Sequence, residues 1–242
     1  MRKAFLFALS MLLISQFSFA KIWLEIGPKA TFGPSGFYNS VLANDANHDY
    51  SLNLAFNYGG VVGLNIGDSH GFNFEVLTGS YFQDFTSRPA AGELIRNTVE
   101  WEVLDLYALY RYYPKSGMYA ELGPKFTRIN EFKQTTGVDP IVTQGQYEED
   151  YLSGVLGVGA FLSGSETMVF KMGLRFEYGL SDLVSAEGML NGYPSVTSNL
   201  SDQGDTTPFR VSFGMELSFG VGGVAQGVCG RRGFVLGSRY GG

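Results

Sequence analysis

The chain has 242 residues, a formal net charge of −6, 33 glycines, 15% aromatic residues and a single cysteine. The lone cysteine, Cys229, excludes a fold held together by disulfide bonds within the chain. Abundant glycine and aromatic residues are typical of membrane β-barrels, which need tight strands and aromatic girdles at the membrane surfaces. The composition therefore suits a secreted β-protein with an apolar exterior.

The first twenty residues have the three parts of a secretory signal peptide. Arg2 and Lys3 precede an apolar run that ends about residue 17, and Ser18-Phe19-Ala20 forms a cleavage site with small residues. Residue 21 is lysine, so the lipid-modified cysteine of a lipoprotein is missing. No later run of about 18 apolar residues follows, which argues against a helical membrane span. The mature chain of 242 − 20 = 222 residues fits one domain.

The mature chain opens with a segment that returns near its middle. Residues 23–32, Trp-Leu-Glu-Ile-Gly-Pro-Lys-Ala-Thr-Phe, recur with changes as residues 119–127, at an offset of 121 − 25 = 96 positions. In both copies apolar and polar residues alternate, and the polar face repeats a pair of charges, Glu25 with Lys29 and Glu121 with Lys125. A period of two predicts a β-strand with two different faces. Here one face is suited to lipid and the other to a polar interior.

Six further segments show the same alternation. We therefore predict an all-β fold, an eight-stranded antiparallel up-and-down transmembrane β-barrel of the outer-membrane type over residues 21–220, because an open sheet edge cannot exist in lipid. In chain order the predicted strands are 21–33, 51–65, 72–83, one ending with 105–112, 118–129, 150–162, 168–180 and 209–219.

The predicted connections alternate in length. Short turns lie near 67–71, 114–117 and 163–166, and long polar links span 34–50, 84–97, 130–148 and 182–207. Outer-membrane barrels have short periplasmic turns and long extracellular loops. The N-terminus that follows a signal peptide would then be periplasmic, the long links extracellular, and the glycine-rich tail 221–242 periplasmic and disordered.

Two features do not fit simple strands. Glu100 and Glu102 share the outward parity of the fourth strand, which requires that they lie above the bilayer or that a bulge shifts the phase. Pro28 and Pro124 lie inside strands, where proline removes a hydrogen-bond donor from the ladder. Each follows a glycine, so we expect a bulge or bend at each Gly-Pro pair; the alternative is a shorter strand.

The inward positions predict a charged barrel interior with a net charge of zero. Six acidic residues face six basic ones: Glu25, Glu75, Asp105, Glu121, Glu177 and Glu216 against Lys29, Arg111, Lys125, Lys171, Arg175 and Arg210. An eight-stranded barrel is just wide enough for side chains to fill it, and buried charges must be paired. We therefore expect an ion-pair network that plugs the lumen. The alternative is a polar conduit for small solutes.

The long links are mainly acidic, which argues against a nucleic-acid partner. Their charged residues are Asp45, Asp49, Asp84, Glu93, Glu131, Asp139, Glu148, Glu149, Asp150, Asp182, Glu187, Asp202 and Asp205, against Arg88, Arg96 and Lys133. Residues 45–49, Asp-Ala-Asn-His-Asp, begin like a calcium loop. Tyr50 replaces the turn glycine of such a loop, however, and Phe56 stands where its last glutamate belongs. No metal site is predicted.

Candidate catalytic groups are few, since the chain has only two histidines, His48 and His70. On paper His48 could form a triad with nearby acids and hydroxyls, Asp45 or Asp49 with Ser40 or Ser51. Residues this common within one loop are weak evidence for a triad. We therefore predict a non-enzymatic protein without a cofactor, and keep a surface hydrolase or lipid acyltransferase as a remote alternative.

Several motifs carry a family resemblance over about residues 21–220. They are the signal peptide, Leu-Glu-Ile-Gly-Pro-Lys at 24–29, Arg111-Tyr112 closing the fourth strand, Leu-Arg-Phe-Glu-Tyr-Gly-Leu at 174–180 and the aromatic end of the last strand. The pattern resembles the PorT-like family of small outer-membrane β-barrels common in Bacteroidetes. Resemblance to PorT itself would imply a part in protein secretion across the outer membrane. Residues 220–242 depart from the pattern, because such a barrel normally ends the chain on its aromatic residue.

These observations predict a non-enzymatic outer-membrane barrel with a charge-plugged lumen and a structural or interaction role, an accessory of protein secretion by the resemblance. Its expected partners are outer-membrane lipid and, through the acidic outer loops, secretion machinery or other envelope proteins. The alternative function is a porin-like channel for small solutes.

Overall fold

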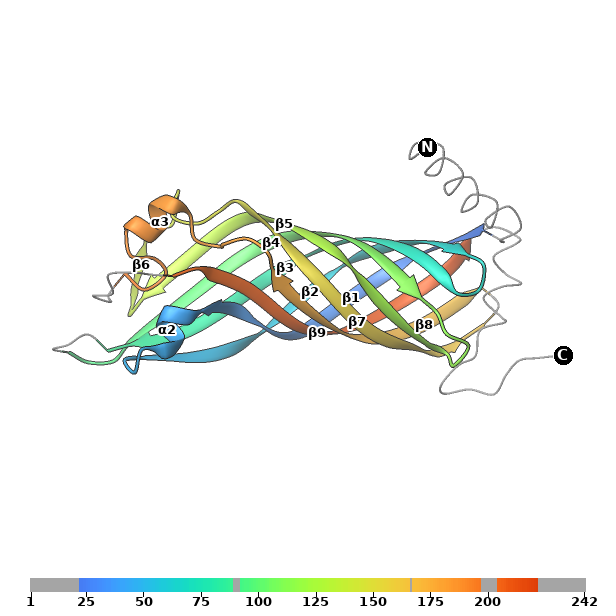
Figure 1. The fold of residues 1–242 in the computed structure, drawn as a ribbon, viewed down its shortest axis with the longest axis horizontal. Helices are drawn as coiled ribbons and strands as arrows, with labels where there is room; N and C mark the ends of the chain where they lie inside the picture. The colour runs from blue at the N-terminus through green and yellow to red at the C-terminus, as the bar shows by residue number, and fades with distance from the viewer. Residues whose placement is uncertain (1–21, 89–91, 166, 197–203, 222–242) are drawn as a thin grey trace, which may run out of the picture.

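The computed structural model describes residues 22–88, 92–165, 167–196 and 204–221 (Figure 1). The elements are β1 (Ile22–Asn39), α2 (Ser40–Asn44), β2 (His48–Ile66), β3 (His70–Ser87), β4 (Ile95–Tyr112), β5 (Met118–Thr136), β6 (Asp139–Ile141), β7 (Asp150–Gly164), β8 (Met168–Gly179), α3 (Ala186–Leu190) and β9 (Thr206–Val221). The predicted signal peptide, Cys229 and all but the first residue of the predicted tail lie outside the described residues. No helix among those described has the length and apolar character needed to cross a membrane.

Eight of the strands close into a ring. Their order is β4-β3-β2-β1-β9-β8-β7-β5, all neighbours are antiparallel, and the pairing of β4 with β5 joins the two ends. The short β6 pairs with the end of β5. The predicted eight-stranded up-and-down barrel is therefore confirmed. The short turns lie at one end of the barrel, here called the turn end, and α2, α3 and β6 lie at the other, the loop end (Figure 1).

The two faces of the strands also agree with the prediction. On β8, the outward Leu174, Phe176 and Tyr178 are exposed, whereas Lys171 and Glu177 point inward and are buried. An apolar outer wall around a polar interior is stable only where lipid surrounds it. The fold is thus that of an outer-membrane barrel.

The strands extend further toward the loop end than the sequence predicted. β1 continues to Asn39, β3 to Ser87 and β5 to Thr136. The predicted long links 34–50, 84–97 and 130–148 are therefore in part strand, and the prediction of their bounds was wrong. Strand pairing needs only backbone hydrogen bonds, so it continues where the apolar outer face ends.

Along β4, the kinds of residue that face outward and inward exchange where the apolar outer face ends. Near its middle the apolar Leu106 points outward and Asp105 inward, but closer to the loop end Glu102 points outward while Trp101 and Val103 are buried inside. The β3–β4 register runs without a shift from His70↔Tyr112 to Ser87↔Ile95. The β4–β5 register does shift between Glu102 and Val103, but the extra residue, Asn130, is on β5, so the phase of β4 itself does not change. Its outward glutamates lie beyond the apolar band, where the outer face meets water and the inner face becomes the apolar one.

Both Gly-Pro pairs lie within continuous strands, so the shorter-strand alternative was wrong. Pro28 lies opposite Gly60, and the β1–β9 ladder is interrupted at Gly27–Pro28 but resumes in the same register. No extra residue is inserted, so a bulge does not form at this position. The interruption brings the β9 backbone close to β1: a Cβ at Gly27 would lie 1.8 Å from the carbonyl oxygen of Leu217. Only glycine fits this approach.

Candidate functional site: the filled barrel interior

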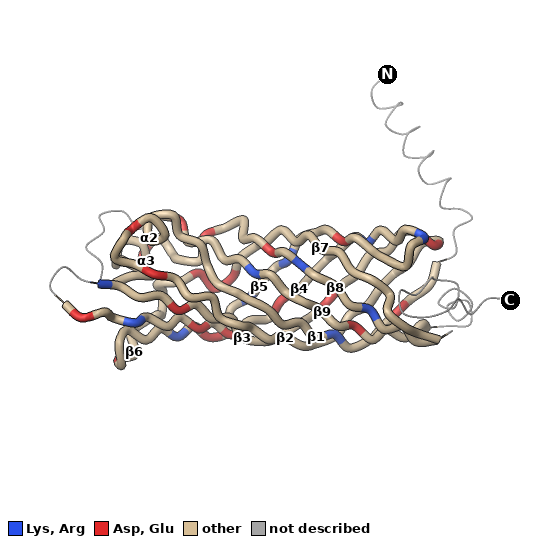
Figure 2. The backbone as a smooth tube through the Cα atoms, turned by 90° about the horizontal axis from the view of Figure 1, so that it is seen from below, with Lys and Arg blue, Asp and Glu red and all other residues tan. Residues whose placement is uncertain are grey.

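The structure places all twelve predicted interior charges inside the barrel, and none of these residues is more than 5% exposed. Figure 2 shows charged residues spread along the length of the tube rather than gathered at its ends. By their ion pairs and hydrogen bonds the twelve form two neighbouring clusters. Each cluster has as many acidic as basic residues, so each has a net charge of zero.

The eight-charge cluster lies toward the turn end and consists of Glu25, Lys29, Glu75, Arg111, Glu121, Lys171, Arg175 and Glu216. Glu75 is one of two acids in this cluster that each lie within ion-pair distance of three cations; Glu216 is the other. The Glu75 carboxylate accepts a hydrogen bond of 2.8 Å from Lys29 Nζ and two parallel bonds of 2.7 Å from the Arg175 guanidinium. Arg111 Nη2 lies 3.3 Å from the same carboxylate. Glu75 therefore contacts three cations, and bidentate geometry makes the Arg175 pair a strong one.

The remaining acids of this cluster are paired in the same way. Arg111 donates to Glu121 at 2.7 Å and to Glu216 at 2.8 Å. Lys171 Nζ lies 2.6 Å from Glu25 and 2.8 Å from Glu216. These bonds join side chains across the whole width of the barrel, so a solute could pass only after several of them had broken.

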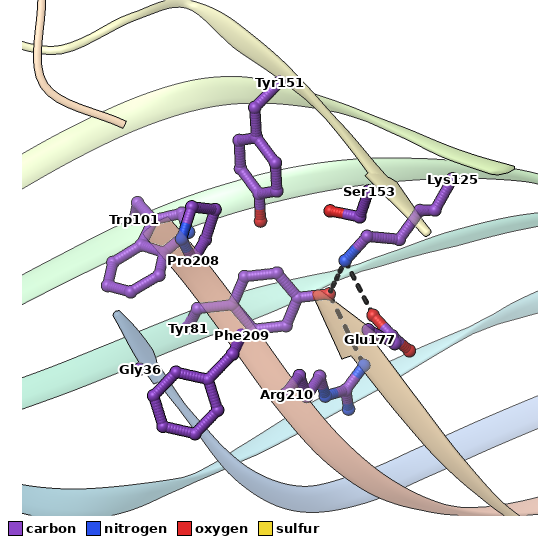
Figure 3. A pocket seen from close by; sticks show the side chains of 10 residues that line it. All are labelled: Gly36, Tyr81, Trp101, Lys125, Tyr151, Ser153, Glu177, Pro208, Phe209 and Arg210. Atoms are coloured by element: carbon purple, nitrogen blue, oxygen red, sulfur yellow. Dashed lines mark hydrogen bonds and ion pairs between the residues drawn. The ribbon is translucent and has the colours of Figure 1, made fainter. Parts of the chain in front are cut away.

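The four-charge cluster lies next along the barrel and consists of Asp105, Lys125, Glu177 and Arg210, with Tyr81 at its centre. Figure 3 shows Tyr81, Lys125, Glu177 and Arg210. Lys125 Nζ is 2.7 Å from Glu177 and 3.8 Å from Asp105. The Tyr81 hydroxyl donates to Asp105 and accepts from Lys125 and Arg210, each at 3.4 Å.

Arg210 is held mainly by neutral groups. Its guanidinium donates to Thr31 Oγ1 at 3.0 Å and lies over the Tyr81 ring, 5.1 Å from the ring centroid. Beside it is a cavity of about 10 Å³, lined also by Tyr81, Lys125 and Glu177 (Figure 3). Such a volume suits one water molecule and is too small for a solute path.

The sequence repeat is visible in the ion pairs. Lys29 on β1 bonds Glu75 on β3 at 2.8 Å, and Lys125 on β5 bonds Glu177 on β8 at 2.7 Å. In each half of the barrel the lysine follows the Gly-Pro pair, and the glutamate lies on the second strand along the chain, not counting β6. The repeated motif thus builds the same contact twice.

Aromatic side chains close the barrel at the turn end. Trp23, Tyr113, Tyr119, Phe161 and Val169 form one buried cluster. Arg111 lies over the Tyr119 ring at 4.8 Å, so this cluster packs directly against the eight-charge cluster. The interior residues predicted from the sequence were all charged, so this aromatic layer was not predicted, although the inward parity of Trp23 was a signal for it.

A larger apolar cluster fills the loop end. It contains Phe37, Ala55, Tyr81, Phe85, Val99, Trp101, Val103, Tyr147, Tyr151, Leu183, Val184 and Tyr193. Phe132 stacks between Trp101 and Tyr147, with centroid distances of 5.8 and 3.6 Å. We call the described parts of residues 37–50, 81–103, 129–149 and 181–206, which surround this cluster, the cap.

The connections of the cap are bonded to one another. Asn39 caps α2 by accepting from the backbone N–H groups of Val41 and Leu42, and its amide donates to Thr206 Oγ1 at 2.9 Å. Gln134 Nε2 donates to the carbonyl oxygen of Pro194 at 2.7 Å. The first, third and last long links are therefore joined into one body over the barrel mouth.

His48 also connects two of the long links. Its Nδ1 is 2.8 Å from Asp45 Oδ2 and its Nε2 is 2.8 Å from the Ser195 hydroxyl. Ser40 and Ser51, the two serines considered from the sequence, are exposed, and the serine that contacts this histidine is Ser195 instead. The order Asp–His–Ser matches a catalytic triad. Ser195, however, is 0% exposed, so the arrangement fastens the first link to the last.

The polar groups of the calcium-like segment 45–49 form hydrogen bonds with one another. Asp45 Oδ1 accepts from the backbone and side-chain amides of Asn47, both at 3.1 Å. The bond from the Asn47 backbone N–H and the bond to His48 hold the pKa of Asp45 below its usual value. In the described part of the chain, no group of three or more His, Cys, Asp or Glu side chains is placed to hold a metal ion.

Two interior residues that the sequence analysis did not single out complete the charged layers. Tyr107 donates to Glu177 at 3.2 Å, and Thr127 donates to Asp105 at 2.6 Å. Both are neutral, so the balance of interior charges gave no reason to predict them. Both share the inward parity of their strands, and that parity was the available signal.

No protein-family model and no curated protein matches this chain. Among solved structures it is similar to the outer membrane protein OprG from Pseudomonas aeruginosa, at 14% identity and a TM-score of 0.44, over 83% of this chain and 96% of that one. It is also similar to Neisserial surface protein A, at 11% identity and a TM-score of 0.41, over 81% of this chain and 97% of that one. The translocator domain of the autotransporter NalP from Neisseria meningitidis is similar at 11% identity and a TM-score of 0.36, over 90% of this chain and 95% of that one. These likenesses concern the fold and say nothing of function.

Proposed function

We propose that this chain is a non-conducting, non-enzymatic outer-membrane barrel that acts through its cap in a structural or interaction role. The single observation that carries the proposal is the filling of the interior along its length. An aromatic cluster, two neutral charge clusters and an apolar cluster follow one another from the turn end to the loop end. Removing single partners from such buried pairs is costly, so the network favours a permanent plug over a gate.

The burial of Ser195, the serine that contacts His48, supports the non-enzymatic part of the proposal. A nucleophile must reach its substrate, and the Ser195 hydroxyl is enclosed by the cap. The charged interior also offers no apolar channel for a lipid tail, which argues against a lipid acyltransferase.

A part in protein secretion rests on the PorT-like resemblance and is the finer form of the proposal. The candidate partners are secretion machinery or other envelope proteins, reached through the cap. Affinity isolation from cross-linked cells tests this: secretion proteins should be enriched with the intact chain. If only abundant barrels and lipid are recovered, the secretion part is wrong.

Conduction separates this proposal from the porin-like alternative. In planar lipid bilayers, we expect the intact protein to give no stable open channel, because water and ions would have to replace the ion pairs of both charge clusters. The measurement is single-channel current across a range of voltages and salt concentrations. Steady, large and reproducible current steps would support the porin-like alternative instead.

We infer that the loop end faces the cell exterior and both chain ends face the periplasm. In a Cys229→Ala background, a cysteine at Asn44 or Val138 in the cap should react with a membrane-impermeant maleimide on whole cells. Both positions are exposed. A cysteine at Ser116, in the β4–β5 turn, should react only after the outer membrane has been opened. Labelling of Ser116→Cys on intact cells would show that the orientation is reversed.

A further inference from the structure

The lipid-facing wall of the barrel has a groove across β8, β9, β1 and β2. Its volume is about 440 Å³. It is lined by small residues on β1 and β2, among them Pro28, Ala30 and Gly59, and by the larger Tyr58, Phe170 and Met215. The groove therefore lies where two successive outward positions of β1 are the small residues Pro28 and Ala30.

The backbone explains why the groove is placed at Pro28. Proline has no N–H to donate, so the β1–β9 ladder is interrupted there and the carbonyl of Leu217 approaches Gly27, where no side chain can be accommodated. On the neighbouring strand, a Cβ at Gly60 would meet nothing nearer than 3.7 Å, so the wall is open above this glycine.

The second copy of the sequence repeat shows that the groove is not a necessary result of the Gly-Pro motif. Residues 28–30 are Pro-Lys-Ala, and the equivalent residues 124–126 are Pro-Lys-Phe. Where β1 has Ala30, β5 thus has Phe126, an outward side chain that is 40% exposed. The chain fills this position in one half of the barrel and leaves it open in the other.

The surroundings of the groove identify its occupant. It is continuous with the apolar outer band, represented on either side of Pro28 by the exposed Ile26 and Phe32 and on β2 by Val62. Lys29 and Glu216, which also border it, direct their buried charges to each other inside the barrel, 3.6 Å apart. The groove consequently offers apolar surface and no exposed charge. It matches a hydrocarbon chain and has nothing to recognise a headgroup.

We propose that this groove binds the acyl chain of a membrane lipid and holds it against the barrel in a fixed position. In lipid no water competes for the site, so binding rests on the close packing of the chain against Tyr58, Phe170 and Met215. The site is independent of the proposed role of the cap, and it distinguishes one side of the barrel from the other.

Photo-crosslinking tests the proposal directly. The intact protein is placed in phosphatidylcholine vesicles with a trace of phosphatidylcholine that carries a diazirine midway along one acyl chain. After illumination, peptide mass spectrometry should find several-fold more adducts on the segments around Tyr58, Phe170 and Met215 than on the segments around Phe126 and Leu152. Even labelling around the barrel would overturn the proposal.

Ala30→Phe gives β1 the phenylalanine that β5 has at the equivalent position 126. It should abolish most of the excess of lipid adducts around the groove. Gly60→Val should do the same from the neighbouring strand, which keeps the test decisive if one variant folds poorly. Ala120→Phe, at an exposed outward alanine on β5, is the matched control and should leave the pattern unchanged. Heat-modifiable gel mobility checks that each variant is folded. An excess that survives in folded Ala30→Phe and Gly60→Val would also overturn the proposal.

A second copy of this chain is the competing occupant. In a Cys229→Ala background, Ala30→Cys in vesicles should remain monomeric under oxidising conditions if a lipid chain fills the groove. Efficient disulfide-linked dimers through residue 30 would instead identify the groove as an interface between copies and reject the lipid site.

Discussion

Replacing Glu75 with glutamine is expected to lower the free energy of unfolding by about 3–5 kcal/mol, the cost of leaving a buried charge without its partner. The substitution preserves the shape of the side chain and removes one charge. Among the described residues, it leaves Lys29 with only Glu216, 3.6 Å away, and Arg175 with only Glu121 as carboxylate partners, and it gives the eight-charge cluster a net positive charge. Urea titration of the protein in lipid vesicles, followed by heat-modifiable gel mobility, measures the loss.

The control for Glu75 is Glu102→Gln, on the outer face of β4. Glu102 lies 3.9 Å from Lys133, both side chains are about half exposed, and such surface pairs contribute about 0–1 kcal/mol. A double variant, Glu75→Gln with Lys29→Met, restores a neutral interior and should recover part of the stability. Equal effects of Glu75→Gln and Glu102→Gln would contradict the plug.

Replacing Trp101 with alanine is expected to cost about 3–5 kcal/mol, as is usual for a large aromatic side chain removed from a packed core. Trp101 is 1% exposed and packs against Tyr81 and Phe132, with both centroid distances 5.8 Å. The wall around it lies beyond the apolar band, so the ordinary hydrophobic effect of water-soluble proteins applies here.

The effect of Trp101→Ala should be concentrated in the cap. Limited proteolysis should cut the long links much faster than in the unchanged protein. The parts of the β-strands that surround the charge clusters and the turn end should stay protected. Val138→Ala, at a 90% exposed position next to β6, is the control and should change neither rate. A Trp101→Ala variant with unchanged proteolysis would show that the apolar cluster does not hold the cap together.

Each of the two interior substitutions probes a different layer. Glu75→Gln acts on pairs that span the middle of the barrel, so it should shift global unfolding with little change in the protease sensitivity of the cap. Trp101→Ala should first raise the protease sensitivity of the cap, with a smaller shift in global unfolding. If both variants lose stability and protection together, the barrel and its cap unfold as a single unit.

The sequence by itself determined the barrel and its two faces. Alternation of apolar and polar residues is a local property that a strand imposes on its own side chains, and a one-residue slip would reverse it. For that reason the outward Leu174 and the inward Arg175 could be assigned without knowing any neighbour. The twelve interior charges followed from the same parity, as did their balance.

Only the tertiary structure decided where the strands end and what fills their outer part. β4 keeps one phase throughout, yet Glu102 faces outward and Trp101 inward because the medium around the wall changes from lipid to water. Local sequence cannot locate that boundary. It is set by the height of the whole ring relative to the apolar band.

The pairing of interior charges was decided in the same way. Glu75 meets Arg175 one hundred positions along the chain, and His48 meets Ser195 across 147 positions, because closure of the ring and the stagger of its strands bring them to the same height. The sequence determined which residues enter the barrel through a rule of period two. The geometry of closure decided which of them touch, since it depends on all eight registers at once.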